Sequence, residues 1–167
     1  MKHQLTELTR YNVWANARIM DALRTLPPEV IDAPVKGSFT SIRKTIYHIW
    51  DAQVIWLNRL QGISLNMWPS TEYDDNFAGF DVYFIRQSED FVRFVETRTD
   101  SYFETLCYYK TLEGKEYQTR VWEIVMHVMN HSTYHRGQII HMFRSLDIHD
   151  PVSTDFILYS RGKESGF

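Results

Sequence analysis

The sequence predicts an all-α fold, a four-helix bundle with a short extra C-terminal helix and a small β-hairpin between helices 3 and 4. Two observations lead to this expectation. Four long segments carry apolar residues at the three- to four-residue spacing of one helix face. Between them lie stretches rich in proline, glycine and polar turn formers, which end helices. The 167 residues suffice for a single bundle domain over residues 1–167 with a sizeable core.

The first two helices are expected at residues 4–25 and 41–61. Leucine, isoleucine, valine and aromatic residues recur at helical spacing in both segments. Pro27 ends the first helix, because a proline ring is incompatible with a helix interior. Gly62 follows the second helix at the position where helices commonly end. In the connection between them, Ser38 or Thr40 is the expected N-cap of the second helix.

The middle of the chain mixes irregular and regular segments. Residues 62–80 combine turn formers with aromatic residues, and a loop of this length is either functional or a cover over the end of the bundle. A third helix is expected at 81–105. Alternating residues around Glu113-Gly114 then predict a short β-hairpin.

The last long helix is expected at 120–146, and it carries three of the seven histidines at a regular spacing. After it, residues 151–161 read as a turn followed by a short helix. Phe156, Ile157 and Tyr159 are the apolar residues that this helix would pack.

Composition and charge restrict the class of protein. Hydrophobic residues make up 44% of the chain and charged residues 23%, as in folded globular proteins. The net charge of -3 argues against a nucleic-acid partner. A single cysteine, Cys107, excludes an internal disulfide and favours a cytoplasmic location. The sequence contains no apolar run that predicts a signal peptide or a membrane span, so no membrane association is expected.

Three histidines form a stripe on the fourth helix. His127, His131 and His135 recur every fourth residue and therefore share one helix face. Neighbouring members can chelate one cation, as in other helical metal sites. The outer two lie about 12 Å apart along the axis at 1.5 Å per residue, which is too far to share a metal. This helix therefore supplies at most two ligands.

A third ligand has to come from elsewhere in the chain. His3 lies at the N-terminus and His149 in a turn, whereas His48 lies in the middle of an apolar helix. A histidine buried in a bundle needs a partner for its ring nitrogens, and a metal shared with a facing helix provides one. The residues thus predict a site made of His48 and two of the three stripe histidines, and leave open which two.

Such a site has positions left for chemistry. Three protein nitrogens leave at least one coordination position for water or substrate, as in catalytic rather than structural zinc sites. Asp51 and Glu123 lie close in sequence to these histidines and could orient the imidazoles, although both also fit ordinary solvent-facing charges. Tyr11, Trp14 and Asn130 are further candidates for neighbours of the site.

Four segments of the chain resemble one known family. They read Y-N-V-W-A-N-A-R, T-I-Y-H-I-W-D-A-Q-V-I-W-L-N-R, H-V-M-N-H-S-T-Y-H-R-G-Q-I-I and P-V-S-T-D-F-I-L-Y-S-R. In this order they are similar to the DinB (damage-inducible) family of bundle proteins, which includes YfiT-like proteins and is distinct from the DNA polymerase of the same name. The resemblance covers nearly the whole chain and is weakest over 62–118.

The resemblance implies a particular ligand set and a class of activity. It implies a four-helix bundle in which His48, His131 and His135 bind a divalent metal, with His127 as a neighbour. It also implies a homodimer, since family members are often dimers. Relatives include thiol S-transferases and isomerases that use low-molecular-weight thiols such as bacillithiol and mycothiol. The metal is expected to be Zn or Ni, with Fe, Mn and Cu as alternatives.

Three functions are compatible with these expectations. The first is a thiol-dependent S-transferase type of enzyme that acts on a small-molecule substrate at the open metal position. The second is a metal-dependent hydrolase, in which the metal holds hydroxide. The third is not an enzyme but a metal- or ligand-binding protein of the stress response. The sequence identifies no catalytic residue beyond the metal ligands.

Overall fold

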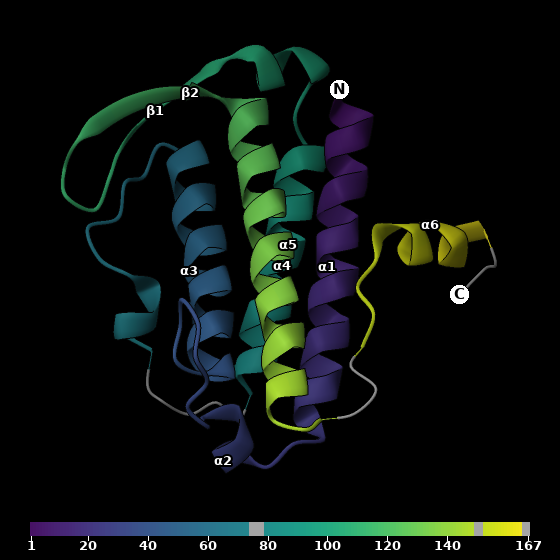
Figure 1. Cartoon of the computed structure of the whole chain (residues 1–167). Coiled ribbons are helices and arrows are strands. Elements are labelled where there is room, and N and C mark those ends of the chain that lie inside the picture. Colours follow the sequence, from purple (N-terminus) through teal and green to yellow (C-terminus); the bar gives the residue numbers. More distant parts are fainter. Residues whose placement is uncertain (74–78, 149–151, 165–167) are drawn as a thin grey trace.

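Four long helices form the body of the protein (Figure 1). The computed structural model describes residues 1–73, 79–148 and 152–164. The long helices are α1 (Lys2–Arg24), α3 (Ile42–Leu60), α4 (Phe80–Glu96) and α5 (Val121–Ser145). Helix α1 packs against α4 and α5, and α3 packs against α5 and α4. The predicted bundle is therefore confirmed.

Shorter elements connect and extend the bundle. The predicted hairpin is present: β1 (Leu106–Lys110) pairs antiparallel with β2 (Glu116–Arg120). Its turn contains Gly114 at a φ of 82°, a left-handed conformation that favours glycine. The predicted extra C-terminal helix is present as α6 (Phe156–Glu164). The remaining short elements are α2 (Pro28–Ile31) and the 3-10 turns η1 (Pro69–Thr71) and η2 (Asp100–Glu104).

The third long helix ends earlier than expected. Helix α4 stops at Glu96 rather than at residue 105, and η2 follows it. The Thr97 hydroxyl donates to the backbone oxygens of Arg93 and Phe94, which gives the backbone an alternative to further helix. Phe103 nevertheless lies in the core, so the apolar pattern indicates its burial correctly, although the residue belongs to η2 and not to the long helix.

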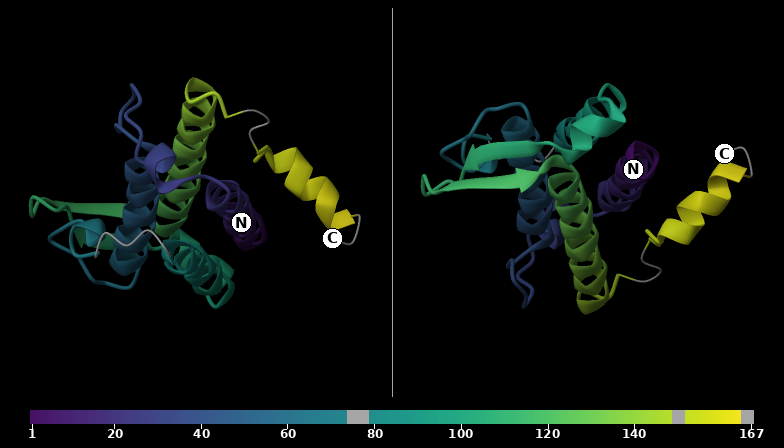
Figure 2. Two further views of the ribbon diagram at one scale, coloured as in Figure 1. Left: turned by 90° about the horizontal axis from the view of Figure 1, so that it is seen from below. Right: turned by 90° about the horizontal axis from the view of Figure 1, so that it is seen from above.

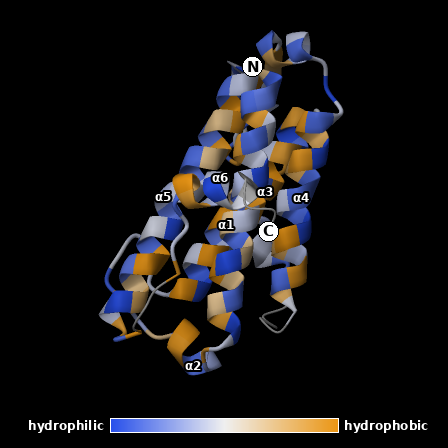
Figure 3. Ribbon diagram, turned by 90° about the vertical axis from the view of Figure 1, so that its right-hand side faces the viewer, coloured by the Kyte–Doolittle hydropathy of each residue, from blue (hydrophilic) through white to orange (hydrophobic). Residues whose placement is uncertain are grey.

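Two apolar cores lie at opposite ends of the bundle. One contains Phe91, Phe103 and Val125, and the other contains Ile46 and Phe143. Hydrophobic and hydrophilic residues alternate along the long helices, as the hydropathy colouring shows (Figure 3). Between the two cores every long helix contributes buried polar side chains, which form a polar layer made of Asn12, Asn16, Gln53, Ser88, Ser132 and Arg136.

Arg136 is the charged member of the polar layer. Its side chain is 1% exposed. One terminal nitrogen donates to the Oδ1 atoms of Asn12 and Asn16, at 2.6 and 2.8 Å. The other donates to the Thr133 hydroxyl at 2.9 Å. Neutral oxygens thus solvate this cation, and no described acidic side chain forms an ion pair with it.

The two asparagines connect this hydrogen-bond network to α3 and α4. Asn12 Nδ2 donates to Gln53 Oε1 at 3.1 Å, and Asn16 Nδ2 donates to the Ser88 hydroxyl at 3.0 Å. Ser88 in turn donates to Gln53 Oε1 at 3.0 Å. The layer therefore links all four long helices by hydrogen bonds halfway along the bundle.

Helix α6 stands to one side of the bundle, next to α1 (Figure 2). The Tyr159 ring packs on those of Tyr11 and Trp14, with centroids 5.8 and 5.7 Å apart. The Tyr11 hydroxyl donates to the backbone oxygen of Thr154 at 2.7 Å. In the described ranges, no helix has both the length and the hydropathy to cross a bilayer.

The N-cap of α3 is Ser41, not Ser38 or Thr40. The Ser41 hydroxyl accepts a hydrogen bond from the Lys44 amide, an otherwise unpaired donor of the first turn. Ser41→Ala is expected to lower the free energy of unfolding by about 1 kcal/mol, measured by urea denaturation. Thr40→Ala is the matched control and is expected to change it by less than about 0.5 kcal/mol. Equal effects of the two substitutions would contradict this assignment of the cap.

Candidate metal centre

Three histidines converge where α3 and α5 lie side by side. His48 comes from the middle of α3, and His131 and His135 come from successive turns of α5. Their ring centroids are 4.4 to 4.7 Å apart. One nitrogen from each ring can be chosen so that all three atoms lie within 4.8 Å of one another. The structure therefore brings together the three histidines that the family resemblance selected.

The nitrogen atoms fit a divalent cation. The Nε2 atoms of His48 and His131 are 2.9 Å apart. Two imidazole nitrogens bound tetrahedrally to one zinc ion are separated by about 3.3 Å, so a small adjustment of these rings would accommodate an ion. His135 Nδ1 lies 2.8 Å from Gln138 Oε1, which leaves its Nε2 as the atom available for a metal. This pairing is the usual arrangement for a metal-binding histidine.

Burial keeps the three imidazoles neutral at pH 7. Burial, followed by the neighbouring imidazoles, lowers the pKa of His131 to about 3. Burial and the field of His135 lower the pKa of His48 to about 4. Burial also lowers the pKa of His135, although the hydrogen bond to Gln138 opposes this change. Because a histidine must be deprotonated to bind a metal, this environment favours a cation over protons.

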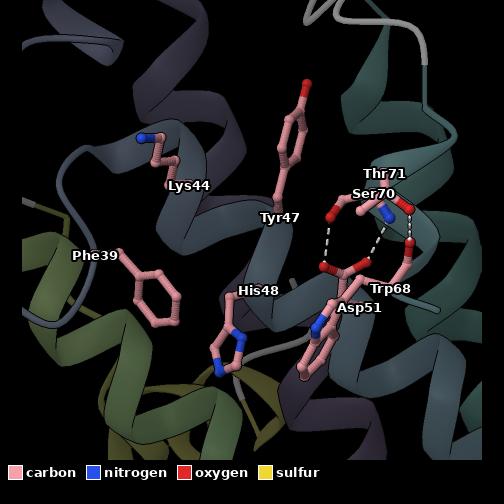
Figure 4. A pocket seen from close by; sticks show the side chains of 8 residues that line it. All are labelled: Phe39, Lys44, Tyr47, His48, Asp51, Trp68, Ser70 and Thr71. Atoms are coloured by element: carbon pink, nitrogen blue, oxygen red, sulfur yellow. Dashed lines mark hydrogen bonds between the residues drawn. The ribbon is translucent and has the colours of Figure 1, made fainter. Parts of the chain in front are cut away.

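A pocket of about 430 Å³ opens beside His48 and is called here the Trp68 pocket (Figure 4). The Phe39 ring lies 4.4 Å from the His48 ring on one side, and Trp68 lies 5.9 Å from it on the other. Such a volume is typical of small-molecule sites. The pocket is lined by Phe39, Lys44, Tyr47, His48, Asp51, Trp68, Ser70 and Thr71.

Asp51 holds one wall of this pocket in place. Its side chain is buried, at 4% exposure, and does not face solvent. One carboxylate oxygen accepts from the Ser70 amide at 2.7 Å and the other from the Ser70 hydroxyl at 2.6 Å (Figure 4). These bonds attach η1, and with it Trp68, to α3. Asp51 therefore fixes the loop beside the histidines, and among the described residues its carboxylate forms no hydrogen bond with an imidazole.

Removing this attachment is expected to loosen the pocket while leaving the metal ligands intact. In Asp51→Ala, the Ser70 amide loses a charge-assisted acceptor, which is worth about 1.5–3 kcal/mol per bond. We expect faster hydrogen–deuterium exchange of the backbone at 68–71 and unchanged metal stoichiometry. Asp21→Ala, an exposed aspartate on α1, is the control. Unchanged exchange at 68–71 would show that Asp51 does not restrain this loop.

The other candidate residues lie outside the cluster. The His127 ring is 5.8 Å from that of His131 and packs edge-on against Trp56. Glu123 accepts from the Arg120 amide at the start of α5 and serves as a cap. Asn130 is exposed on α5. Tyr11 and Trp14 pack against α6 rather than at the cluster.

The remaining candidates for a third ligand are placed as follows. His3 is exposed near the N-terminus, and His149 lies outside the described residues. Sequence reasoning missed Gln138, whose spacing of three residues after His135 was a usable signal. It also missed the parts played by Phe39 and Trp68, which come from irregular segments where no periodicity indicates the direction of a side chain.

Comparisons with known proteins agree on one family. The model of the DinB family matches residues 1–166. Protein DinB of Bacillus subtilis (strain 168) is 30% identical over 161 residues, which cover 92% of this chain and 91% of the relative. Among solved structures, YfiT from Bacillus subtilis superposes with a TM-score of 0.69 at 14% identity, over 88% of this chain and 90% of YfiT.

The structural comparison supports the fold, and the two sequence comparisons establish the family. YfiT is described as a probable metal-dependent hydrolase with an unusual four-helix bundle topology. At 14% identity, its likeness to this chain concerns the arrangement of the helices. The family match spans the whole described bundle and includes the segments with all three clustered histidines. The chain therefore belongs to the DinB family.

Proposed function

We propose that this protein is a metal-dependent enzyme whose ligands are His48, His131 and His135 and whose small-molecule substrate binds in the Trp68 pocket. The observation that carries the proposal is the convergence of three neutral imidazoles beside a pocket of about 430 Å³. Zinc or nickel is the proposed ion, and Fe, Mn and Cu remain alternatives. Elemental analysis of protein purified without added metal tests this choice.

The chain's own residues prepare the site for a bound substrate. A divalent ion held by three nitrogens supplies a Lewis-acidic position that favours a deprotonated thiol or water. Gln138 fixes the orientation of His135, and Asp51 fixes the loop that carries Trp68. Phe39 and Trp68 flank His48 with apolar surface, which excludes water and strengthens electrostatic interactions there.

Thiol-dependent transfer is the first candidate reaction. A thiol would lose its proton to solvent, its sulfur would form a bond to an electrophilic carbon, and the leaving group would depart with the electron pair. This step needs no carboxylate base. It therefore suits a pocket in which Asp51, the one acidic side chain among the described lining residues, uses both of its oxygens on Ser70.

The test is consumption of a small thiol with a dinitrohalobenzene by zinc-loaded protein. Turnover is expected with the wild-type protein and is expected to be lost in His131→Ala. His141→Ala is the matched control, because His141 is exposed on the same helix and lies outside the cluster. Turnover that survives removal of the metal would refute the proposed chemistry.

Hydrolysis is the second candidate, favoured by the description of YfiT as a probable metal-dependent hydrolase. A panel of activated esters and amides tests it. Hydrolysis whose pH dependence contains an ionisation that shifts when zinc is exchanged for nickel would favour this reaction. If the protein holds one metal but neither panel reacts, a non-enzymatic metal- or ligand-binding role is favoured instead.

We further propose that the chain forms a homodimer through α6. Phe156, Ile157 and Leu158 are 42% to 56% exposed on a helix that stands beside the bundle (Figure 2). Ile157→Asp is expected to shift the protein from dimer to monomer in size-exclusion chromatography with light scattering. A wild-type monomer at high micromolar concentration would contradict the proposal.

A further inference from the structure

Arg59 is a buried cation on the same helix as His48. Eleven residues, or about three turns, separate the two, so both lie on one face of α3. The Arg59 side chain is held between two aromatic rings, with its guanidinium carbon 4.5 Å from the centre of Trp56 and 5.0 Å from the centre of Tyr109. Only 7% of the residue is exposed.

The guanidinium of Arg59 has no hydrogen-bond partner among the described residues. Its Nε is buried and unpaired. Its two terminal nitrogens form no hydrogen bond with a described residue either and, unlike Nε, are not fully buried. Glu113 contributes a favourable field without forming an ion pair. Burial lowers the pKa of Arg59, as expected for a cation without a paired anion.

A continuous row of side chains connects Arg59 to the metal centre. The Trp56 ring that stacks on Arg59 contacts the exposed His127 ring edge-on, with centroids 5.3 Å apart. The His127 ring is in turn 5.8 Å from that of His131. Arg59 lies about 16 Å from His48 along the α3 axis at 1.5 Å per residue. Both side chains lean toward the N-terminus of α3, and because the arginine side chain is the longer of the two, its guanidinium lies nearer to the His48 ring than this axial separation.

We propose that Arg59, framed by Trp56 and Tyr109, binds the carboxylate or phosphate of an extended substrate whose other end reaches the three-histidine centre. This inference rests on the proposed function. The terminal nitrogens present the planar, two-pronged donor geometry that matches such anions. The aromatic rings hold the guanidinium in place before the anion arrives, which reduces the entropy lost on binding. His127 lies along the path between the two ends of the substrate.

The experiment compares thiols that differ only at the far end. Zinc-loaded protein is titrated by calorimetry with 6-mercaptohexanoate, with its uncharged analogue 6-mercaptohexanol, and with the phosphate ester of the latter. The wild-type protein is expected to bind one of the two anions at least roughly tenfold more tightly than the alcohol, and the better one identifies the anion class. Equal affinities for all three would overturn the proposal without any variant.

Arg59→Met removes the charge and keeps an apolar stem in the buried position. It is expected to abolish the preference for the anion while leaving the affinity for the alcohol unchanged. Arg59→Lys is expected to retain part of the preference. Arg98→Met is the matched control: Arg98 also stacks on two rings, those of Phe94 and Tyr102, and also has an unpaired buried Nε.

The outcomes separate the subsite from the reaction. Equal weakening of all three ligands in Arg59→Met would show a structural clamp and refute the subsite. Arg59-dependent binding of the anion without turnover would refute the proposed transfer and keep the subsite. If the protein takes up no zinc, the metal proposal fails, and titration of inorganic phosphate into wild-type and Arg59→Met protein then tests the subsite alone.

Discussion

Replacing His48 with alanine is expected to abolish stoichiometric metal binding. His48 is the one member of the cluster supplied by α3, and without it two imidazoles on α5 have to hold the ion alone. The loss of affinity should exceed the 10- to 100-fold that removal of an outer hydrogen-bond partner costs. Metal analysis after dialysis, together with competition against a chromogenic chelator, measures the change.

In His48→Ala, the melting temperature is expected to be the same with and without metal. An ion present at about 100 times its Kd stabilises the folded wild-type protein by about 2.7 kcal/mol. For a chain of this length, that corresponds to a rise in Tm of roughly 5 to 10 °C. No such rise is expected in His48→Ala, whereas His127→Ala, in the neighbouring turn of the stripe, should keep it. Full metal binding by His48→Ala would rule out the proposed ligand set.

Replacing Arg136 with alanine is expected to cost about 3–5 kcal/mol of unfolding free energy. The substitution leaves the Oδ1 atoms of Asn12 and Asn16 without their donor and opens a cavity at the centre of the bundle. Both asparagines are fully buried, so water cannot readily replace the lost bonds. Chemical denaturation followed by circular dichroism measures the loss.

Two further variants define this effect. Arg86→Ala on α4 removes an exposed arginine and is expected to change the free energy of unfolding by less than about 0.5 kcal/mol. Arg136→Met restores the volume but not the hydrogen bonds, and it should fall between the wild-type protein and Arg136→Ala. If Arg136→Ala were as stable as Arg86→Ala, the hydrogen bonds of Arg136 would make no net contribution to the free energy of unfolding.

Much of the fold could be predicted because it follows from local patterns. Helical periodicity located the four long helices, and Glu113-Gly114 located the hairpin. The end of α4 could not be placed, because Tyr102 and Phe103 continue the apolar pattern in a 3-10 turn that packs on the same core. Periodicity reports burial of a residue, and burial does not require that the residue belong to the helix.

The clustered histidines could be predicted only in part from spacing. The stripe on α5 limited the choice to two neighbouring members, and the family resemblance selected His131 and His135. The positions of Asp51 and Trp68 depend on a bond between α3 and an irregular segment 19 residues further on. No pattern along the chain specifies such a contact, so the wall of the pocket had to come from the structure.

The polar layer fixes how far each long helix is shifted along its axis relative to the others. Apolar contacts are non-directional and therefore specify the relative position of two helices along their axes less strictly than hydrogen bonds do, even against a slide of one helical turn of about 5.4 Å. Hydrogen bonds from Arg136 to Asn12 and from Asn12 to Gln53 have no equivalent partner one turn away. Arg136 follows His135 directly, and Gln53 lies little more than one turn beyond His48. The alignment of α3 and α5 in the layer therefore also determines whether His48 lies opposite His131 and His135. Substitutions in the two apolar cores should therefore change stability without displacing the histidines, whereas changes in the layer should displace them.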